Sequence, residues 1–222
     1  MLTTISNNFD LVRIFEQKLC EYTGFKYAVC CDCCTNAILI SLELLARNNI
    51  INKKEIILDI PEQTYMSVPM TLLNNNWNIQ LKSINWQSHY NITPYVVDAA
   101  VGFKQNMVHF YNDNQLVCVS FQQKKRLALG RGGAILFNDK KYLDSLQRMV
   151  YDGRNPYISD TIEVLDKNKI ILGYHCYMEP DKAAQGILKL NQAQLLPEFK
   201  YITNRDYPNL KNLTCLKDYS NG

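Results

Sequence analysis

Three groups of polar residues follow short apolar runs in this sequence, and each contains side chains that could bind or react with a ligand. They are segment 32–35 (Asp-Cys-Cys-Thr), Asp98, and segment 120–125, which runs from Ser120 to Lys125. Short apolar runs of this kind are typical of buried strands. In sheets of parallel strands, ligands bind where the carboxyl ends of the strands meet. We therefore expect the three groups to converge on one site.

The first group lies in a cluster of four cysteines, Cys30, Cys31, Cys33 and Cys34. A structural zinc site needs a second Cys pair or histidines at matching spacing, and none follows, so a metal site is the weaker interpretation. Strand alternation directs Cys30 and Cys31 to opposite faces of a sheet, where small apolar residues fit. Cys33 and Cys34 would form a tight turn, and Thr35 would begin a helix. The N–H groups and positive dipole end of such a helix favour phosphate.

The second and third groups supply an acid and an amine. Asp98 follows the apolar run YVV, where an acid can bind a metal, cap a helix or pair with a cationic ring nitrogen. Lys125 can form an imine with a carbonyl group if its pKa falls below the usual value of about 10.4. Burial beside Lys124 and Arg126 would lower that pKa. A phosphate-binding turn, an acid and a lysine in this order predict a site for pyridoxal 5'-phosphate (PLP).

The elements that must position these groups alternate between strand and helix. Helical spacing predicts helices over 9–22, 35–49, 65–73 and 140–152, and apolar runs predict strands over 26–31, 54–61, 77–84, 94–100, 115–121 and 132–139. Gly24 should end the first helix, and Pro69 should kink the third or lie in its first turn. This alternation predicts an α/β fold with a mostly parallel sheet flanked by helices. We expect one domain over 1–200, its longest loop over 153–169, and a polar, poorly ordered tail over 201–222.

Composition narrows the class of protein. The chain has 222 residues, of which 47% are apolar and 20% are charged, as in ordinary globular proteins. Its net charge of +3 gives no reason to expect a nucleic-acid partner. No apolar run approaches the ~20 residues of a membrane span. The N-terminus lacks the basic and apolar regions of a signal peptide. We therefore expect a cytoplasmic protein with no membrane partner.

Four segments of the sequence resemble the DegT/StrS family of PLP-dependent sugar aminotransferases. They are FEQKLCEYTGFKYAVCCDCCTNAILISLELL, IPEQTYMSV, VVDAAVGF and SFQQKKRLALGRGGAILFND, with a weaker fifth match in LGYHCYMEPDKAAQGILKLNQ. The family patterns are an SSGTAAL-like turn, P-x-x-T-[FYW], EDAAQ and SFxxxKxxxxGEGG. The resemblance implies the fold of the large domain of fold-type I, aspartate aminotransferase-like enzymes. It also implies that the small C-terminal domain of the family is largely missing here.

The resemblance gives most candidate residues a role around the cofactor. Cys34, Thr35 and Ser120 would bind the cofactor phosphate. Tyr65 would stack on the cofactor ring, and Ala100 would lie against it. Structural alternatives are a helix cap for Thr35, a core position for Tyr65 and a strand-end position for Ser120.

Two further residues would act on the reacting part of the cofactor. Asp98 would pair with the pyridine nitrogen, and Lys125, counted back from Gly130, would form the imine. The alternatives are a helix cap for Asp98 and a surface position for Lys125. Lys124 is interpreted as a surface residue.

The sequence also departs from the family pattern. Val101 replaces a Gln or His beside the cofactor, Arg131 replaces the Glu of GEGG, and His175 replaces an Asn. Tyr177 replaces an Arg that reaches the cofactor of the neighbouring subunit. A strand–helix unit of the family is missing within segment 92–94. These departures favour an alternative function, that of a catalytically degenerate relative acting as a binding or partner subunit.

The resemblance implies transamination of a keto group on a nucleotide-linked sugar, with PLP as cofactor and glutamate as amino donor. Such a reaction would serve the biosynthesis of surface polysaccharide or glycoconjugates. The family's active site lies between two subunits, so a homodimer is implied. A sugar dehydratase is a third possibility, but the related dehydratases have His where this sequence has Lys125.

Overall fold

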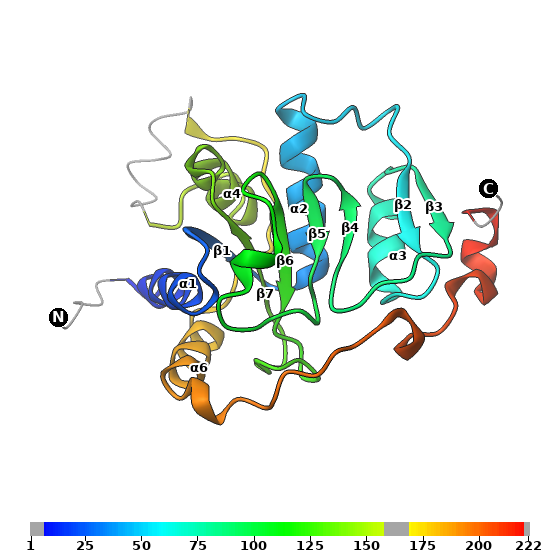
Figure 1. The fold of residues 1–222 in the computed structure, drawn as a ribbon. Coiled ribbons are helices and arrows are strands. Elements are labelled where there is room, and N and C mark those ends of the chain that lie inside the picture. The colour runs from blue at the N-terminus through cyan, green and yellow to red at the C-terminus, as the bar shows by residue number, and fades with distance from the viewer. Residues whose placement is uncertain (1–6, 158–168, 220–222) are drawn as a thin grey trace.

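A five-stranded mixed sheet forms the centre of the chain, in a computed structural model that describes residues 7–157 and 169–219 (Figure 1). Part of the expected loop over 153–169 lies outside these residues. In spatial order the strands are β1 (Tyr27–Cys31), β7 (Gly133–Phe137), β6 (Leu116–Ser120), β5 (Val96–Asp98) and β4 (Tyr90–Thr93). Only β5 and β6 pair in parallel, and the other three pairings are antiparallel.

A second, two-stranded sheet lies beside β4. It consists of β2 (Leu58–Pro61) and β3 (Ile79–Lys82), which pair in parallel, and β2 packs against β4. The prediction of an α/β fold is confirmed, but the prediction of a mostly parallel sheet is wrong. A short connection is the reason for one of these antiparallel pairings, that of β4 with β5, because parallel neighbours need a crossover of a dozen or more residues.

The hairpin of β4 and β5 shows this constraint most clearly. Only Pro94 and Tyr95 connect the two strands, which therefore must run antiparallel. The Thr93 hydroxyl closes the turn by accepting hydrogen bonds from the N–H groups of Tyr95 (3.2 Å) and Val96 (3.0 Å). This hairpin includes segment 92–94, where the family resemblance predicted the loss of a strand–helix unit.

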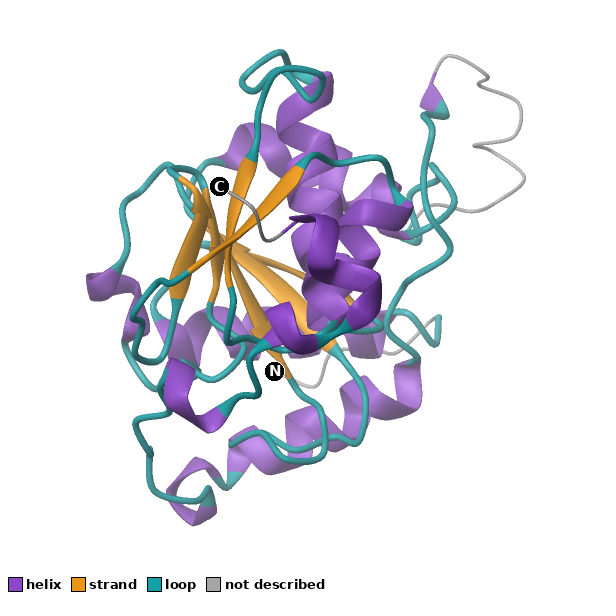
Figure 2. Ribbon diagram, turned by 90° about the vertical axis from the view of Figure 1, so that its right-hand side faces the viewer, coloured by secondary structure: helices purple, strands orange, loops and turns teal. Residues whose placement is uncertain are grey.

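Within the described residues, five α-helices lie around the sheet. Figure 2 shows helices on both sides of the sheet. They are α1 (Asp10–Thr23), α2 (Cys34–Arg47), α3 (Ser67–Asn74), α4 (Leu143–Val150) and α6 (Pro180–Asn191). The 3-10 helices are Met107–Phe110, Lys140–Tyr142, Ala193–Leu195, Asn204–Asp206, Leu210–Asn212 and Thr214–Tyr219. Gly24 ends α1 in the left-handed conformation, and Pro69 lies in the first turn of α3, as predicted. α6 was not predicted.

The sheet separates two hydrophobic cores. α1 and α6 pack on one face, and α2 and α4 pack on the other. Cys30 belongs to the first core and Cys31 to the second, which confirms their predicted opposite orientation. Each fully buried large side chain, such as Phe15 or Leu42, stabilises the fold by about 1.5–3 kcal/mol.

The C-terminal segment runs from α6 along the edge of the sheet where β5 and β6 end, and then reaches β2 and β3 (Figure 1). The N–H group of Leu210 donates to the carbonyl of Glu62 (2.7 Å), and the side chains of Leu210 and Leu216 are buried. Residues 201–219 therefore pack on the sheet and do not form the loose tail that their polar composition predicted. Among the described residues, no helix is long and apolar enough to cross a membrane.

Candidate active site

A cavity of about 410 Å³ opens between the carboxyl ends of β5 and β6 and the start of α2. It has the size of a small-ligand pocket. The structure brings together all seven residues that the sequence singled out, because the cavity is lined by Cys34, Thr35, Tyr65, Asp98, Ala100, Ser120 and Lys125. Four other polar residues also line the cavity, namely Cys33, Ser67, Gln122 and Arg131. Cys33 and Gln122 lie within the predicted groups 32–35 and 120–125, and Arg131 was noted as a departure from the family pattern, so Ser67 is the one that sequence reasoning missed.

The start of α2 forms one wall of the cavity. The helix begins at Cys34, one residue earlier than predicted, and the thiol of Cys33 accepts a hydrogen bond from the N–H group of Asn36 (3.4 Å). The first N–H groups of a helix have no carbonyl partner within it, so they can bind an anion. β7 approaches this turn so closely that a Cβ at Gly133 would collide with the backbone nitrogen of Cys34. Glycine is therefore required there.

Three hydroxyl groups add to this wall. The hydroxyls of Thr35 and Ser67 lie 2.6 Å apart, and the hydroxyl of Ser120 accepts a hydrogen bond from the N–H group of Gln122 (3.3 Å). Hydroxyl groups beside helix N–H groups are suitable donors for a phosphate. Ser67 could have been found from the sequence, because a serine before an apolar helical run marks a helix start.

The carboxylate of Asp98 is buried and held at both oxygens. Its Oδ1 accepts from the N–H group of Ala100 (2.9 Å), and its Oδ2 accepts from the hydroxyl of Tyr90 (2.8 Å). Because Tyr90 has a single hydroxyl proton, Thr64, at 2.8 Å, must donate to the Tyr90 oxygen. Burial raises the pKa of Asp98 above its usual value, although these two donors and the charge of Lys125 act to lower it. The site therefore contains a desolvated acid suited to a cationic partner.

Lys125 is half-buried, and burial lowers its pKa below the usual value, while the charge of Asp98 acts in the opposite direction. The predicted cause of this shift, crowding by Lys124 and Arg126, is wrong. Lys124 is exposed, and Arg126 turns away to donate to the carbonyl of Pro197 (2.7 Å). Neither cation is among the groups that shift the pKa of Lys125.

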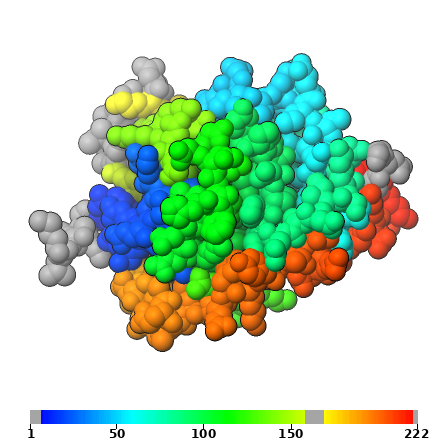
Figure 3. All heavy atoms as spheres, in the orientation of Figure 1, coloured from blue at the N-terminus to red at the C-terminus, as the bar shows by residue number. Residues whose placement is uncertain are grey.

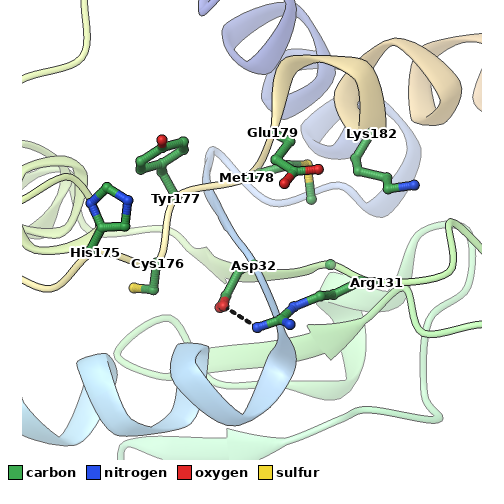
Figure 4. Close-up of a pocket in the computed structure, with 9 residues that line it drawn as sticks. Asp32, Arg131, His175, Cys176, Tyr177, Met178, Glu179 and Lys182 are labelled. Carbon is green, nitrogen blue, oxygen red and sulfur yellow. Dashed lines mark hydrogen bonds and ion pairs between the residues drawn. The ribbon is translucent and has the colours of Figure 1, made fainter.

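Arg131 joins this cavity to a neighbouring cavity of about 320 Å³. Its guanidinium donates to the Asp32 carboxylate at 2.6 Å, so Asp32 serves Arg131 and is not an open ligand group. Figure 4 shows this ion pair opposite Glu179 and Lys182, which lie at the start of α6. Tyr177 lies farther along the same wall and packs against other aromatic rings.

The cysteines do not form a metal centre within the part of the chain that the structure describes. All eight are free thiols, and no three His, Cys, Asp or Glu side chains among the described residues converge as metal ligands. Burial raises the pKa of the Cys33 thiol to about 11 and that of the Cys34 thiol well above its usual value. Both thiols are therefore protonated at neutral pH and serve as small residues at the turn.

Solved structures with similar folds are PLP enzymes and their relatives. The chain is similar to NtdA from Bacillus subtilis with bound cofactor PMP, at 17% identity and a TM-score of 0.63, over 83% of this chain and 48% of that one. It is similar to a mutant GDP-4-keto-6-deoxymannose-3-dehydratase with bound GDP-perosamine, at 14% identity and a TM-score of 0.63, over 83% and 61%. It is also similar to an aminotransferase from Psychrobacter cryohalolentis, at 16% identity and a TM-score of 0.59, over 83% and 57%. These likenesses define the fold class.

A model of the DegT/DnrJ/EryC1/StrS aminotransferase family matches residues 3–111 and 111–201, and the chain belongs to this family. The family predicted from the sequence is thereby confirmed. No curated protein matches the chain significantly. The chain spans between about half and three fifths of the length of the three solved structures named above.

Proposed function

We propose that this chain is a PLP-dependent aminotransferase that transfers an amino group from glutamate to a keto group on a nucleotide-linked sugar. The observation that carries this proposal is the convergence of Asp98, Lys125 and the start of α2 in one cavity. Membership of an aminotransferase family supports the reaction. The likeness to a structure with bound GDP-perosamine supports the substrate class.

The residues that line the cavity fit PLP. The helix start at Thr35 and the hydroxyl of Ser120 offer donors to a phosphate, and the buried carboxylate of Asp98 suits a protonated ring nitrogen. Tyr65 is 51% exposed and lines the cavity, so its ring is available for stacking on the cofactor. Ala100 presents only a methyl group to the same space. When bound, PLP supplies an electron sink through which amino groups are exchanged.

Lys125 is the residue that would hold the cofactor and move protons. Its lowered pKa increases the share of neutral amine, which is the form that attacks a carbonyl group. The nearby charge of Asp98 opposes this decrease, so Lys125 can also accept a proton during turnover. Burial and the charge of Asp98 together suit Lys125 both to attack a carbonyl group and to accept a proton.

We further propose that the protein acts in the cytoplasm as a homodimer, in the biosynthesis of surface polysaccharide or glycoconjugates. These proposals are supported by the family to which the chain belongs. The degenerate, non-catalytic alternative is retained as an outcome of the experiment below.

A cofactor-loading experiment tests the proposal. The purified protein is mixed with PLP, freed of excess cofactor and examined by visible spectroscopy, with Lys125→Ala and its sequence neighbour Lys124→Ala alongside. We expect a yellow band in the wild type and in Lys124→Ala that borohydride reduces and glutamate bleaches, and no such band in Lys125→Ala. A folded wild-type protein without the band would overturn the proposal and favour the non-catalytic relative. A full band in Lys125→Ala would show that another residue binds the cofactor.

A further inference from the structure

Two cavities lie on either side of the loop that follows β6, outside the cofactor cavity. One, of about 200 Å³, lies between this loop and segment 197–202; the other, of about 460 Å³, lies between the loop and the end of α6. Both are lined by Lys124, Lys125, Arg126 and Pro197. We call the two cavities together the basic groove. Figure 3 shows the segment after α6, in orange, along this lower edge of the molecule.

Cations outnumber acids along the basic groove, and none of these cations forms an ion pair with a carboxylate of the described residues. Five cations line it, namely Lys124, Lys125, Arg126, Lys189 and Lys200. Glu198 is the single acidic residue along the groove among the described residues, and none of the five cations has a carboxylate within 4.0 Å there. Elsewhere in the protein, Arg131 and Lys53 are paired with acids. A concave surface with one sign of charge attracts counter-ions of the opposite sign.

Arg126 fixes the shape of the basic groove while keeping its own charge. Its Nε donates to the carbonyl of Pro197 and its Nη1 donates to the hydroxyl of Tyr22, both at 2.7 Å. Both acceptors are neutral, so the guanidinium is held in place without being neutralised. Lys189 similarly donates to the carbonyl of Ala128. The groove is therefore organised before a ligand arrives, which reduces the ordering cost of binding.

The basic groove adjoins the cofactor cavity directly. Ala100 and Lys125 line both the cofactor cavity and the smaller cavity of the groove. A ligand whose reactive end reaches Lys125 could therefore extend into the smaller cavity, which Lys124 and Lys200 line. Both of these side chains are exposed. Lysine and arginine are the usual partners of phosphate oxygens.

We infer that the basic groove binds the diphosphate of the nucleotide-linked sugar and so directs the sugar's keto carbon toward Lys125. This inference rests on the proposed function, because it assigns a location to the anionic part of that substrate. Lys125 itself lines both the cofactor cavity and the groove, and the other cations of the groove have no carboxylate partner among the described residues. Phe199 borders the same cavity and offers an apolar surface beside the phosphates.

Calorimetric titration tests the inference. PLP-treated protein is titrated with UDP, GDP, dTDP and inorganic pyrophosphate. The groove variant carries Lys124→Ala and Lys200→Ala, and the matched control carries Lys54→Ala and Lys217→Ala, two exposed lysines outside the groove. We expect the Kd of at least one nucleoside diphosphate, and of pyrophosphate, to rise about tenfold or more in the groove variant and to stay unchanged in the control.

The outcomes separate the groove from the proposed function. Equal affinity in the groove variant and the control, or no measurable binding of any of the four ligands by the wild type, would overturn the inference. The yellow PLP band is recorded for every variant and should be retained in both. Loss of nucleotide binding with a retained band supports the groove. A wild type without the band contradicts the proposed function, whereas the titration still tests the groove.

Discussion

The protein buries two carboxylates with nearly the same hydrogen-bond partners but in different regions. Asp98 lies at the cofactor cavity, and Glu16 lies between α1 and β1 on the opposite face of the sheet. Each accepts one backbone N–H group and one tyrosine hydroxyl, from Tyr90 for Asp98 (2.8 Å) and from Tyr157 for Glu16 (2.9 Å). Hydrogen bonding alone therefore does not distinguish a site acid from a core acid.

Charge and space do distinguish the two regions. Burial raises the pKa of Glu16 to about 7, and no cation is among the groups that shift it. Burial also raises the pKa of Asp98, but the charge of Lys125 counteracts it. Asp98 borders a cavity of about 410 Å³, whereas the space beside Glu16 is about 10 Å³. Of the two acids, Asp98 alone has space beside it for a cationic ligand. Its desolvation can therefore strengthen ligand binding, whereas that of Glu16 cannot.

The largest difference between the regions should be seen in reactivity. Asp98→Asn and Glu16→Gln each replace a buried acid by its neutral isostere. We expect Asp98→Asn to slow the bleaching of the PLP band by glutamate about 100-fold or more, because a charge aimed at the cofactor is lost. Glu16→Gln should react at nearly the wild-type rate. The measurement is a stopped-flow record of the PLP band after mixing with glutamate. Equal decreases in the bleaching rate in both variants would show that the two acids do not differ in function.

The positions of Asp98 and Lys125 at strand ends were predictable from the sequence. Asp98 is the last residue of β5 and Lys125 lies in the loop after β6. The parallel pairing of these two strands brings their carboxyl ends together. That local argument needs only one parallel pair. It therefore survives although most of the sheet is antiparallel.

The supporting residues were not predictable, because they depend on pairing between distant or reversed segments. Tyr90 reaches Asp98 only because β4 turns back on β5, and an apolar strand has the same pattern in either direction. The lowered pKa of Lys125 was attributed to Lys124 and Arg126, which are its neighbours in sequence but are not among the groups that shift its pKa. Leu210 is buried, but it was not predicted to be, because the segment around it is polar.

The next largest effect is expected in how the free energy of unfolding depends on pH, and it comes from Glu16. Burial raises the pKa of Glu16 from its ordinary value of 4.5 to about 7 in the folded protein, so the folded state binds the proton more tightly than the unfolded state. The contribution of Glu16 to stability is therefore fully present below about pH 4.5 and falls as the pH rises through about 7, by about 1.4 kcal/mol per pH unit. Urea unfolding across this range should show the decrease in the wild type and a flatter profile in Glu16→Gln. The exposed Glu55→Gln should keep the wild-type slope, and an unchanged slope in Glu16→Gln would contradict the prediction.

The smallest effect is expected from removing the tyrosine hydroxyl that donates to the carboxylate in each region. Tyr90→Phe and Tyr157→Phe each remove one hydrogen bond to a buried carboxylate, so each should lower the free energy of unfolding by about 1–3 kcal/mol. Each hydroxyl lowers the pKa of its carboxyl, so its removal raises that pKa. A less ionised Asp98 should hold the cofactor less tightly, and Tyr90→Phe alone should therefore weaken PLP binding in a fluorescence titration. If both variants weaken it equally, Tyr90 stabilises the fold and does not position Asp98 for the cofactor.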